Sequence, residues 1–198
     1  ESLAGEAPER HGHAVEVRLC AEDPRTFLPQ AGRLERLRLP TGIRVDTGVE
    51  EGDEISVSYD SLIAKLIAHA DTREAAIDQL VLGLSQLQLL GLPTNRAFLM
   101  ACLDHPQFRA GQALIPFLAE RGDDIRQKLL KQEQQVLMPC AQMVIFHPHT
   151  TAQALPAPFT RAVRLLHRRD LLELRVQELG AGRAQINGSE PPHAPDNA

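Results

Sequence analysis

One arginine in the N-terminal part of the sequence has a setting in which a fixed positive charge could act on a small anion. Arg18 lies in residues 13–19 (HAVEVRL), whose alternation predicts a strand with one buried face, and it belongs to the polar face. A guanidinium stays charged at any relevant pH and offers a planar fork of donors. That chemistry suits a small planar anion such as bicarbonate, or an oxygen that gains charge during a reaction. The same pattern also fits an exposed arginine paired with a carboxylate such as Glu16, which is the more frequent role of a surface arginine.

Histidine pairs give little support for a metal site. Two pairs have the period-two spacing that would put both rings on one face of a strand: His11 with His13, and His147 with His149. No third ligand follows either pair at a known zinc spacing. We therefore expect these histidines to face water, and we predict no metal site.

Nucleophilic catalysis and nucleotide binding also lack their sequence signatures. None of Cys20, Cys102 and Cys140 has a histidine placed to activate it, so we expect three small buried hydrophobes. Neither G-x-x-x-x-G-K-[ST] nor G-x-G-x-x-G occurs, so the chain is not expected to hold a nucleotide by itself. Asp60, in the segment SYDS, is expected to serve as a turn or cap residue.

Hydrophobic periodicity predicts several strands before the first long helix. The apolar positions of the first strand, which we expect to be buried, are Val15, Val17 and Leu19. Short apolar segments bounded by turn residues predict further strands at residues 34–39, 43–45 and 54–57. Residues 61–69 fit either a helix or a strand.

The clearest predicted helix covers residues 71–90. Asp71 and Glu74 can form a capping pair at its start, apolar residues recur at helical spacing, and Gly91 supplies a stop. A second helix is expected after Thr94. Two more are expected at residues 114–120 and 123–135.

Composition changes after about Gly122, and we expect a domain boundary at about residue 121, which divides the chain into residues 1–121 and 122–198. Residues 136–159 contain four prolines and no clear period. Three strands are predicted beyond them, at residues 162–167, 171–179 and 184–186, followed by a loop or linker to the C-terminus. The predicted fold class is α+β, an antiparallel sheet with packed helices followed by a small strand-rich partial domain.

Composition and charge exclude some classes of partner. The chain has 198 residues, of which 43% are hydrophobic, enough for one or two domains with a real core. A net charge of -5 gives no basic surface for nucleic acid. No apolar run approaches the roughly 20 residues that span a bilayer, so we expect no membrane association. The odd, widely spaced cysteines predict no disulfide framework, and a cytoplasmic, reducing setting is the simplest expectation.

Six sequence motifs resemble a known family. Residues 12–24 (GHAVEVRLCAEDP) are very similar to the segment G-H-A-[IV]-E-x-R-[LI]-x-A-E-D-P that opens the C-terminal subdomain of biotin carboxylases. Five further matches follow in the family's order: FLP with Gly32 at 27–32, RVDTGVEEG at 44–52, YDSLIAKLI at 59–67, GLPTN at 91–95 and HPQFRAG at 105–111. Because six motifs occur in one order, the resemblance is specific over residues 12–121.

The resemblance implies an ATP-dependent ligase reaction in which bicarbonate is activated and the ureido nitrogen of biotin is carboxylated. A carboxyltransferase then moves the carboxyl group to an acyl-CoA. The arginine of the first motif, here Arg18, would contact bicarbonate and stabilise the biotin enolate, so the resemblance favours the catalytic role that the strand pattern left open. Arg44 and Asp60 would lie near the surface through which family members contact another subunit.

The resemblance also implies which parts of the machinery lie elsewhere. ATP and Mg²⁺ would be bound by an ATP-grasp domain that these residues do not contain, so the 198-residue chain would be inactive alone. The biotin attachment motif A-M-K-M is absent, and none of Lys65, Lys128 and Lys131 has methionine neighbours. Biotin would therefore be carried on another domain. The implied partners are that biotin carboxyl carrier domain, a carboxyltransferase β subunit and other α subunits.

Residues 122–198 resemble, in pattern only, the bridging domain that joins biotin carboxylase to the biotin carrier in acyl-CoA carboxylase α subunits. The pattern of the strand-rich part resembles that of 3-methylcrotonyl-CoA or geranyl-CoA carboxylase. This resemblance favours those carboxylases over pyruvate carboxylase. An assembly module that contacts the carboxyltransferase subunit is the alternative function for this chain.

Overall fold

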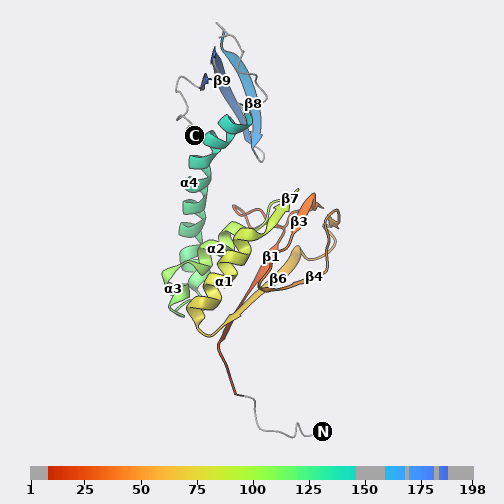
Figure 1. Ribbon diagram of the computed structural model, residues 1–198, viewed down its shortest axis with the longest axis vertical. Helices are drawn as coiled ribbons and strands as arrows, with labels where there is room; N and C mark the ends of the chain where they lie inside the picture. The colour runs from red at the N-terminus through yellow and green to blue at the C-terminus, as the bar shows by residue number, and fades with distance from the viewer. Residues whose placement is uncertain (1–8, 146–158, 168–169, 181–182, 187–198) are drawn as a thin grey trace, which may run out of the picture. The chain divides into compact units, whose positions relative to one another are not determined.

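The computed structural model describes residues 9–145, 159–167, 170–180 and 183–186, and it divides into two compact units (Figure 1). The first unit comprises residues 1–129 and the second residues 130–198. The division falls inside one long helix, α4 (Phe117–Ile145).

The first unit is built on an antiparallel three-stranded sheet. Its strands are β1 (His13–Cys20), β6 (Leu62–Ala70) and β4 (Arg44–Thr47), in the order β1-β6-β4. Residues 62–70 form a strand, which settles the ambiguity of residues 61–69, because they occupy the central position and pair on both sides. The predicted strand at residues 13–19 is confirmed, and its apolar positions are at most 9% exposed: Val15, Val17 and Leu19.

Two short ladders extend this unit. The first pairs β2 (Gly32–Arg33) with β5 (Glu54–Ile55), and the second pairs β3 (Arg36–Arg38) with β7 (Gln88–Leu90). The predicted strands at 34–39, 43–45 and 54–57 are therefore present in shortened or shifted form.

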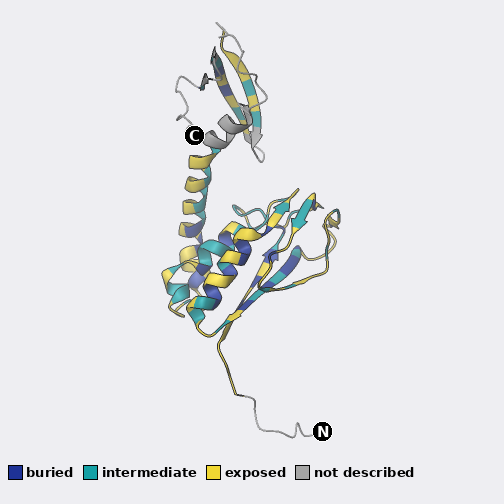
Figure 2. Ribbon diagram, in the orientation of Figure 1, coloured by how far each residue is buried: buried dark blue, intermediate teal, exposed yellow. Residues whose placement is uncertain are grey.

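Helices cover the apolar side of the sheet (Figure 1). The first, α1 (Arg73–Gln86), packs on β1 and β6 through residues with no exposed surface, including Ile77, Leu80 and Leu84. Two short helices follow, α2 (Arg96–Leu103) and α3 (Pro106–Arg109). Figure 2 shows the buried positions gathered where these helices meet the sheet.

The expected bounds and cap of the first helix were wrong in detail. Thr72, and not Asp71, is the N-cap, and its hydroxyl accepts a hydrogen bond from the N–H of Ala75. The helix ends at Gln86, before the expected end at Leu90, because Gln88–Leu90 pairs with β3. Tertiary pairing has overridden a local pattern that would allow another turn.

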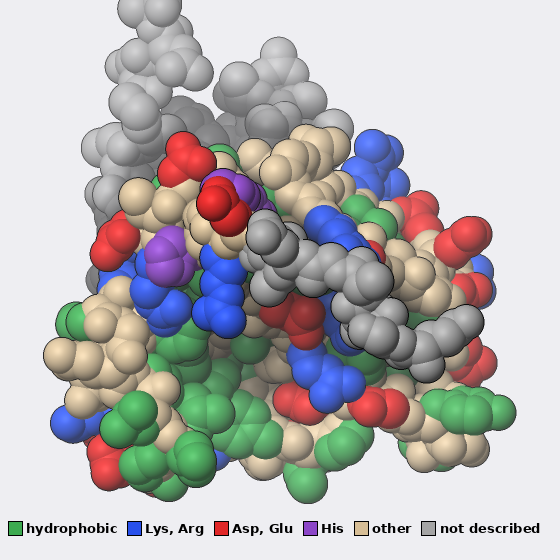
Figure 3. Space-filling view, turned by 90° about the horizontal axis from the view of Figure 1, so that it is seen from below, with side chains coloured by type: hydrophobic (Ala, Val, Ile, Leu, Met, Phe, Trp, Pro, Cys, Tyr) green, Lys and Arg blue, Asp and Glu red, His purple; other side chains and the backbone are tan. Residues whose placement is uncertain are grey.

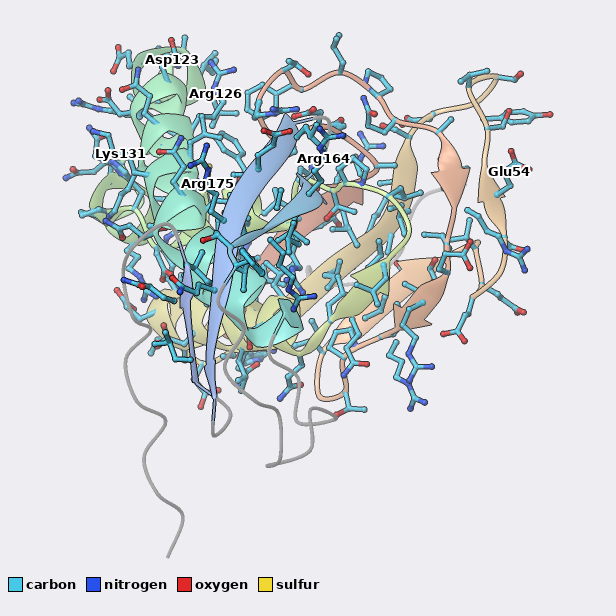
Figure 4. All side chains as sticks on the ribbon, turned by 90° about the horizontal axis from the view of Figure 1, so that it is seen from above. Glu54, Asp123, Arg126, Lys131, Arg164 and Arg175 are labelled. Atoms are coloured by element: carbon cyan, nitrogen blue, oxygen red, sulfur yellow. The ribbon has the colours of Figure 1, made fainter. Side chains whose placement is uncertain are left out.

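A second apolar cluster joins the start of α4 to the helices before it. Phe98, Phe117 and Ile125 are buried together, and the ring of Phe27 meets that of Phe98 edge to face at 4.8 Å. Arg126 forms an ion pair with Asp123 one turn earlier on α4 (Figure 4), and its guanidinium lies 4.8 Å from the centre of the Phe27 ring.

The expectation of two separate helices at 114–120 and 123–135 is wrong, because α4 is continuous across both. Gly122 lies between the two expected helices, and a glycine costs about 1 kcal/mol inside a helix but does not end this one. The helix also runs into residues 136–145, which the sequence pattern left without structure.

The second unit contains an antiparallel sheet of β8 (Arg161–His167), β9 (Asp170–Gly180) and β10 (Arg183–Ile186), in the order β10-β9-β8. Its three predicted strands are confirmed. One face is apolar, with Leu174, Val176 and Ile186 buried. The predicted C-terminal linker, and the pair His147 and His149, lie outside the described residues. Together the two units confirm the α+β class.

Candidate functional site

Arg18 lies on the exposed face of β1, opposite the face that packs on α1. In the antiparallel register it stands directly opposite Lys65 of β6, and Lys65 stands opposite Asp46 of β4. Residues directly opposite one another in such a sheet project from the same face. Two cations and one carboxylate therefore share a row across the three strands.

The neighbouring row contains Glu16, Ile67 and Arg44. Arg44 reaches from it to Asp46, donating from Nε and Nη2 to the two carboxylate oxygens at 2.9 Å each. These bonds lower the pKa of Asp46 and raise that of Arg44. The carboxylate of Asp46 is therefore paired with Arg44, although both side chains are exposed.

The guanidinium of Arg18 forms no ion pair with a carboxylate in the part of the chain that the structure describes. No ion pair joins it to Glu16 or Asp46 there, so the pairing with Glu16 that the strand pattern allowed is not observed. Strand β1 thus presents an uncompensated guanidinium to solvent, next to a half-buried lysine. Such an arrangement can bind an anion or stabilise a developing negative charge.

Asn95 bonds the backbone of β1 at this point, a role that its place in the GLPTN motif did not predict. Its side-chain amide donates to the carbonyl oxygen of Arg18 at 3.1 Å and accepts from the N–H of Cys20 at 3.0 Å. Its own N–H donates to the carbonyl oxygen of Cys20 at 3.2 Å. An asparagine before a helix is ordinarily taken as a cap, and the local pattern gave no signal for this distant contact.

The two other predicted site residues lie at different places. Arg44 shares the exposed sheet face with Arg18, at the opposite edge strand. Asp60 is exposed in the loop before β6, where its carboxylate accepts from the N–H of Leu62 at 3.0 Å. Asp60 therefore acts locally as a turn residue, as expected.

The two cysteines whose surroundings are described have the environment of structural residues. Desolvation raises the pKa of Cys102 to about 11. Burial, followed by the nearby charge of Glu22, raises the pKa of Cys20. Thiols with raised pKa values are poor nucleophiles near neutral pH, which agrees with the expected structural role. The expected full burial is not found, because Cys20 and Cys102 are only partly buried.

Metal binding and membrane insertion find no support among the described residues. No group of three or more histidine, cysteine, aspartate or glutamate side chains there could hold a metal ion. None of the described helices is both long enough and apolar enough to cross a bilayer. Figure 3 shows acidic and basic side chains interspersed on the face in view, without a patch of one sign.

The Biotin carboxylase C-terminal domain family matches residues 16–120, more than half of the chain. The chain belongs to the biotin carboxylase family. The matched region contains the exposed row of Arg18 and Lys65 and also Asn95, so the candidate site lies wholly within the family's domain.

Curated relatives and solved biotin carboxylase structures agree with this assignment. The chain is 44% identical to the biotin carboxylase of Halalkalibacterium halodurans over 109 residues, covering 54% of this chain and 24% of the relative. It is 34% identical to the methylcrotonoyl-CoA carboxylase α subunit of Mus musculus over 197 residues, covering 93% of this chain and 27% of the relative. The chain therefore spans about a quarter of the length of these relatives.

Among solved structures, the biotin carboxylase domain of Hydrogenobacter thermophilus 2-oxoglutarate carboxylase, in complex with MgADP, ADP and bicarbonate, matches with a TM-score of 0.56. It is 36% identical, over 58% of this chain and 26% of that one. The biotin carboxylase subunit of a pyruvate carboxylase matches with a TM-score of 0.55 at 33% identity, over 58% of this chain and 26% of that one. Both support the α+β fold of the first unit.

Proposed function

We propose that this chain supplies the Arg18 face of a biotin carboxylase active site, in which bicarbonate and ATP are used to carboxylate carrier-bound biotin. The observation that carries the proposal is the exposed guanidinium of Arg18, which forms no ion pair among the described residues, on strand β1 within the matched domain. A solved relative of this domain is described in complex with bicarbonate, a planar anion that suits the donor fork of an arginine.

The register of the sheet adds a second cation to this surface. Arg18 and Lys65 stand directly opposite one another in the register of β1 with β6, so their side chains are neighbours on one face of the sheet. Like charges directly opposite one another destabilise a sheet. An anion or a developing oxyanion bound at this row would relieve that repulsion, so Lys65 strengthens the positive potential that Arg18 presents.

Magnesium and ATP do not fit the described residues, which hold no metal cluster, and the sequence has no phosphate-binding loop. We propose that an ATP-grasp domain in the same subunit holds both. Biotin would arrive on a carrier domain, since no lysine of this chain has the neighbours of the attachment motif. The residues of this chain would then bind and orient the one-carbon anion and stabilise charge on biotin.

A chimeric subunit tests this function directly. The 109-residue match in the Halalkalibacterium halodurans biotin carboxylase would be replaced by the matching residues of this chain. We expect the chimera to carboxylate free biotin in the presence of ATP, Mg²⁺ and bicarbonate, measured as fixation of labelled bicarbonate. A chimera that folds and binds ATP yet fixes no bicarbonate would contradict the proposal.

A second candidate function, assembly of a larger carboxylase, is favoured by the extent of the match. The similarity to the methylcrotonoyl-CoA carboxylase α subunit covers 93% of this chain and therefore includes the second unit. We propose that residues 122–198 form part of a bridging domain that contacts a carboxyltransferase β subunit, with a domain boundary near residue 121. Arg44 and Asp60 would contact another α subunit. The acyl-CoA would be 3-methylcrotonyl-CoA or geranyl-CoA, and the setting a reducing cytoplasm.

A binding experiment separates assembly from catalysis. The complete chain should retain a carboxyltransferase β subunit of the methylcrotonoyl-CoA class in a pull-down at micromolar concentration, whereas a chain that ends at Leu129 should not. Equal retention by both chains would place the contact in the first unit. No retention by either would count against the assembly role.

A further inference from the structure

The side chain of Asn95 forms hydrogen bonds to a distant strand and does not cap the helix that Asn95 begins. It is the N-cap of α2, a position at which asparagine ordinarily accepts a hydrogen bond from the first turn of the helix. No such side-chain bond is present. The amide instead crosses to β1 and bonds the backbone on both sides of Leu19, through Arg18 and Cys20.

The contact has the pattern of an added strand. β1 is an edge strand of its sheet, so its outer edge is available to another partner. The amide of Asn95 donates to one backbone carbonyl and accepts from one backbone N–H, as a peptide group of a neighbouring strand would. Asn95 is only 8% exposed, so its amide needs these partners to offset its burial.

The contact also falls where β1 leaves its regular register. Pairing with β6 is regular from His13 to Leu19 and shifts between Leu19 and Cys20. Without another anchor, a strand end at an irregularity is free to change its twist, and the direction of the preceding side chain changes with it. Asn95 bonds the two residues on either side of this step, so Arg18 is held from its outer edge as well as by its β6 pairing.

We propose that Asn95 is a positioning residue for Arg18, fixing the direction in which the guanidinium points toward its anion. This role rests on the proposed function of Arg18 and deepens it. Asn95 touches neither bicarbonate nor biotin in this proposal, and it acts only through the backbone of β1. Errors of about 1 Å in the placement of a catalytic group can cost about 100-fold in rate.

A double-mutant cycle in the chimeric subunit tests the proposal. We expect Asn95→Ala to lower kcat for biotin carboxylation by about 10- to 100-fold, with a smaller change in KM for bicarbonate. The double variant Arg18→Ala/Asn95→Ala should be no slower than Arg18→Ala alone, because Asn95 has nothing left to position. Independent, multiplicative losses would overturn the proposal, as would normal kcat in Asn95→Ala. Normal activity in Arg18→Ala would instead overturn the proposed function of Arg18 itself.

Two further variants separate positioning from loss of stability. Asn95→Asp retains an acceptor for the N–H of Cys20 but cannot donate to the carbonyl oxygen of Arg18, so its kcat should fall while the chain still folds; normal kcat would overturn the proposal. Thr72→Ala removes a comparable bond, the cap of α1, without touching β1, and kcat should be unchanged. An equal fall in this control would show a general effect of stability and overturn the positioning role.

Hydrogen exchange of the 198-residue chain gives a readout that needs no activity. In Asn95→Ala the amide of Cys20 should lose protection selectively, whereas the amide of Leu19, in the regular part of the ladder with β6, should keep its protection. Retained protection at Cys20 would show that Asn95 does not hold the strand.

Discussion

Arg18→Ala should lower the rate of biotin carboxylation in the chimeric subunit by about 100- to 1,000-fold, the cost typical of removing one donor to a developing oxyanion. The side chain is exposed and makes no ion pair within the described residues, so its removal leaves no buried group unsatisfied. ATP binding should be largely intact, because the described residues hold neither a phosphate loop nor a metal cluster. Rates of bicarbonate fixation and the Kd for ATP are the measurements.

Two further variants test whether the loss of rate in Arg18→Ala comes from the guanidinium of Arg18 itself. Arg18→Lys keeps the charge but loses the planar fork, and an intermediate rate is expected. Arg38→Ala removes another exposed strand arginine, from the β3–β7 ladder, and should leave the rate unchanged. Near-normal carboxylation in Arg18→Ala would refute the catalytic role of Arg18.

Gly91→Ala should destabilise the first unit by about 3–4 kcal/mol, the sum of a strained backbone and a forced shift of packed atoms. Gly91 has a φ of 113°, and an added Cβ would lie 2.1 Å from the carbonyl oxygen of Arg33 and 2.9 Å from the N–H nitrogen of Glu35. Both contacts are backbone atoms, so no side-chain rotation relieves them. Urea denaturation of the 198-residue chain is the measurement.

Gly42→Ala is the matched control, because it imposes a similar backbone penalty without the collision. Gly42 has a φ of 84°, but nothing lies within 4 Å of the position that a Cβ would take. We expect a loss of about 1–2 kcal/mol there. Equal losses in the two variants would mean that the close approach of Arg33 to Gly91 does not matter for stability.

The strand that carries Arg18 could be predicted because its signal is local. Alternation over residues 13–19 identified both the buried face and the exposed side of Arg18, and burial of Val15, Val17 and Leu19 confirms the pattern. The motifs added the family, which the match over residues 16–120 confirms. The role of Arg18 in catalysis stays a prediction.

The incorrect predictions of helix ends and caps depend on contacts between residues that are far apart in the sequence. The first helix stops early because Gln88–Leu90 pairs with β3, whose residues lie 50 to 54 positions earlier in the chain. Likewise, Asn95 reaches the backbone of Arg18 across 77 positions, so nothing around residue 95 distinguishes it from an ordinary helix cap. Two helices were expected at residues 114–120 and 123–135, whereas α4 is continuous from Phe117, and the packing of Phe117 and Ile125 stabilises it on both sides of Gly122.

The continuity of α4 decides where this region can be excised from a longer gene. A protein cut at residue 120, where the family match ends, would lose Ile125 from beside Phe98 and Phe117 and would expose both aromatic rings. It would also lose the cation above the ring of Phe27. A soluble expression product should therefore retain the helix through Leu129, and a stop codon placed at the apparent edge of the domain should yield aggregating material.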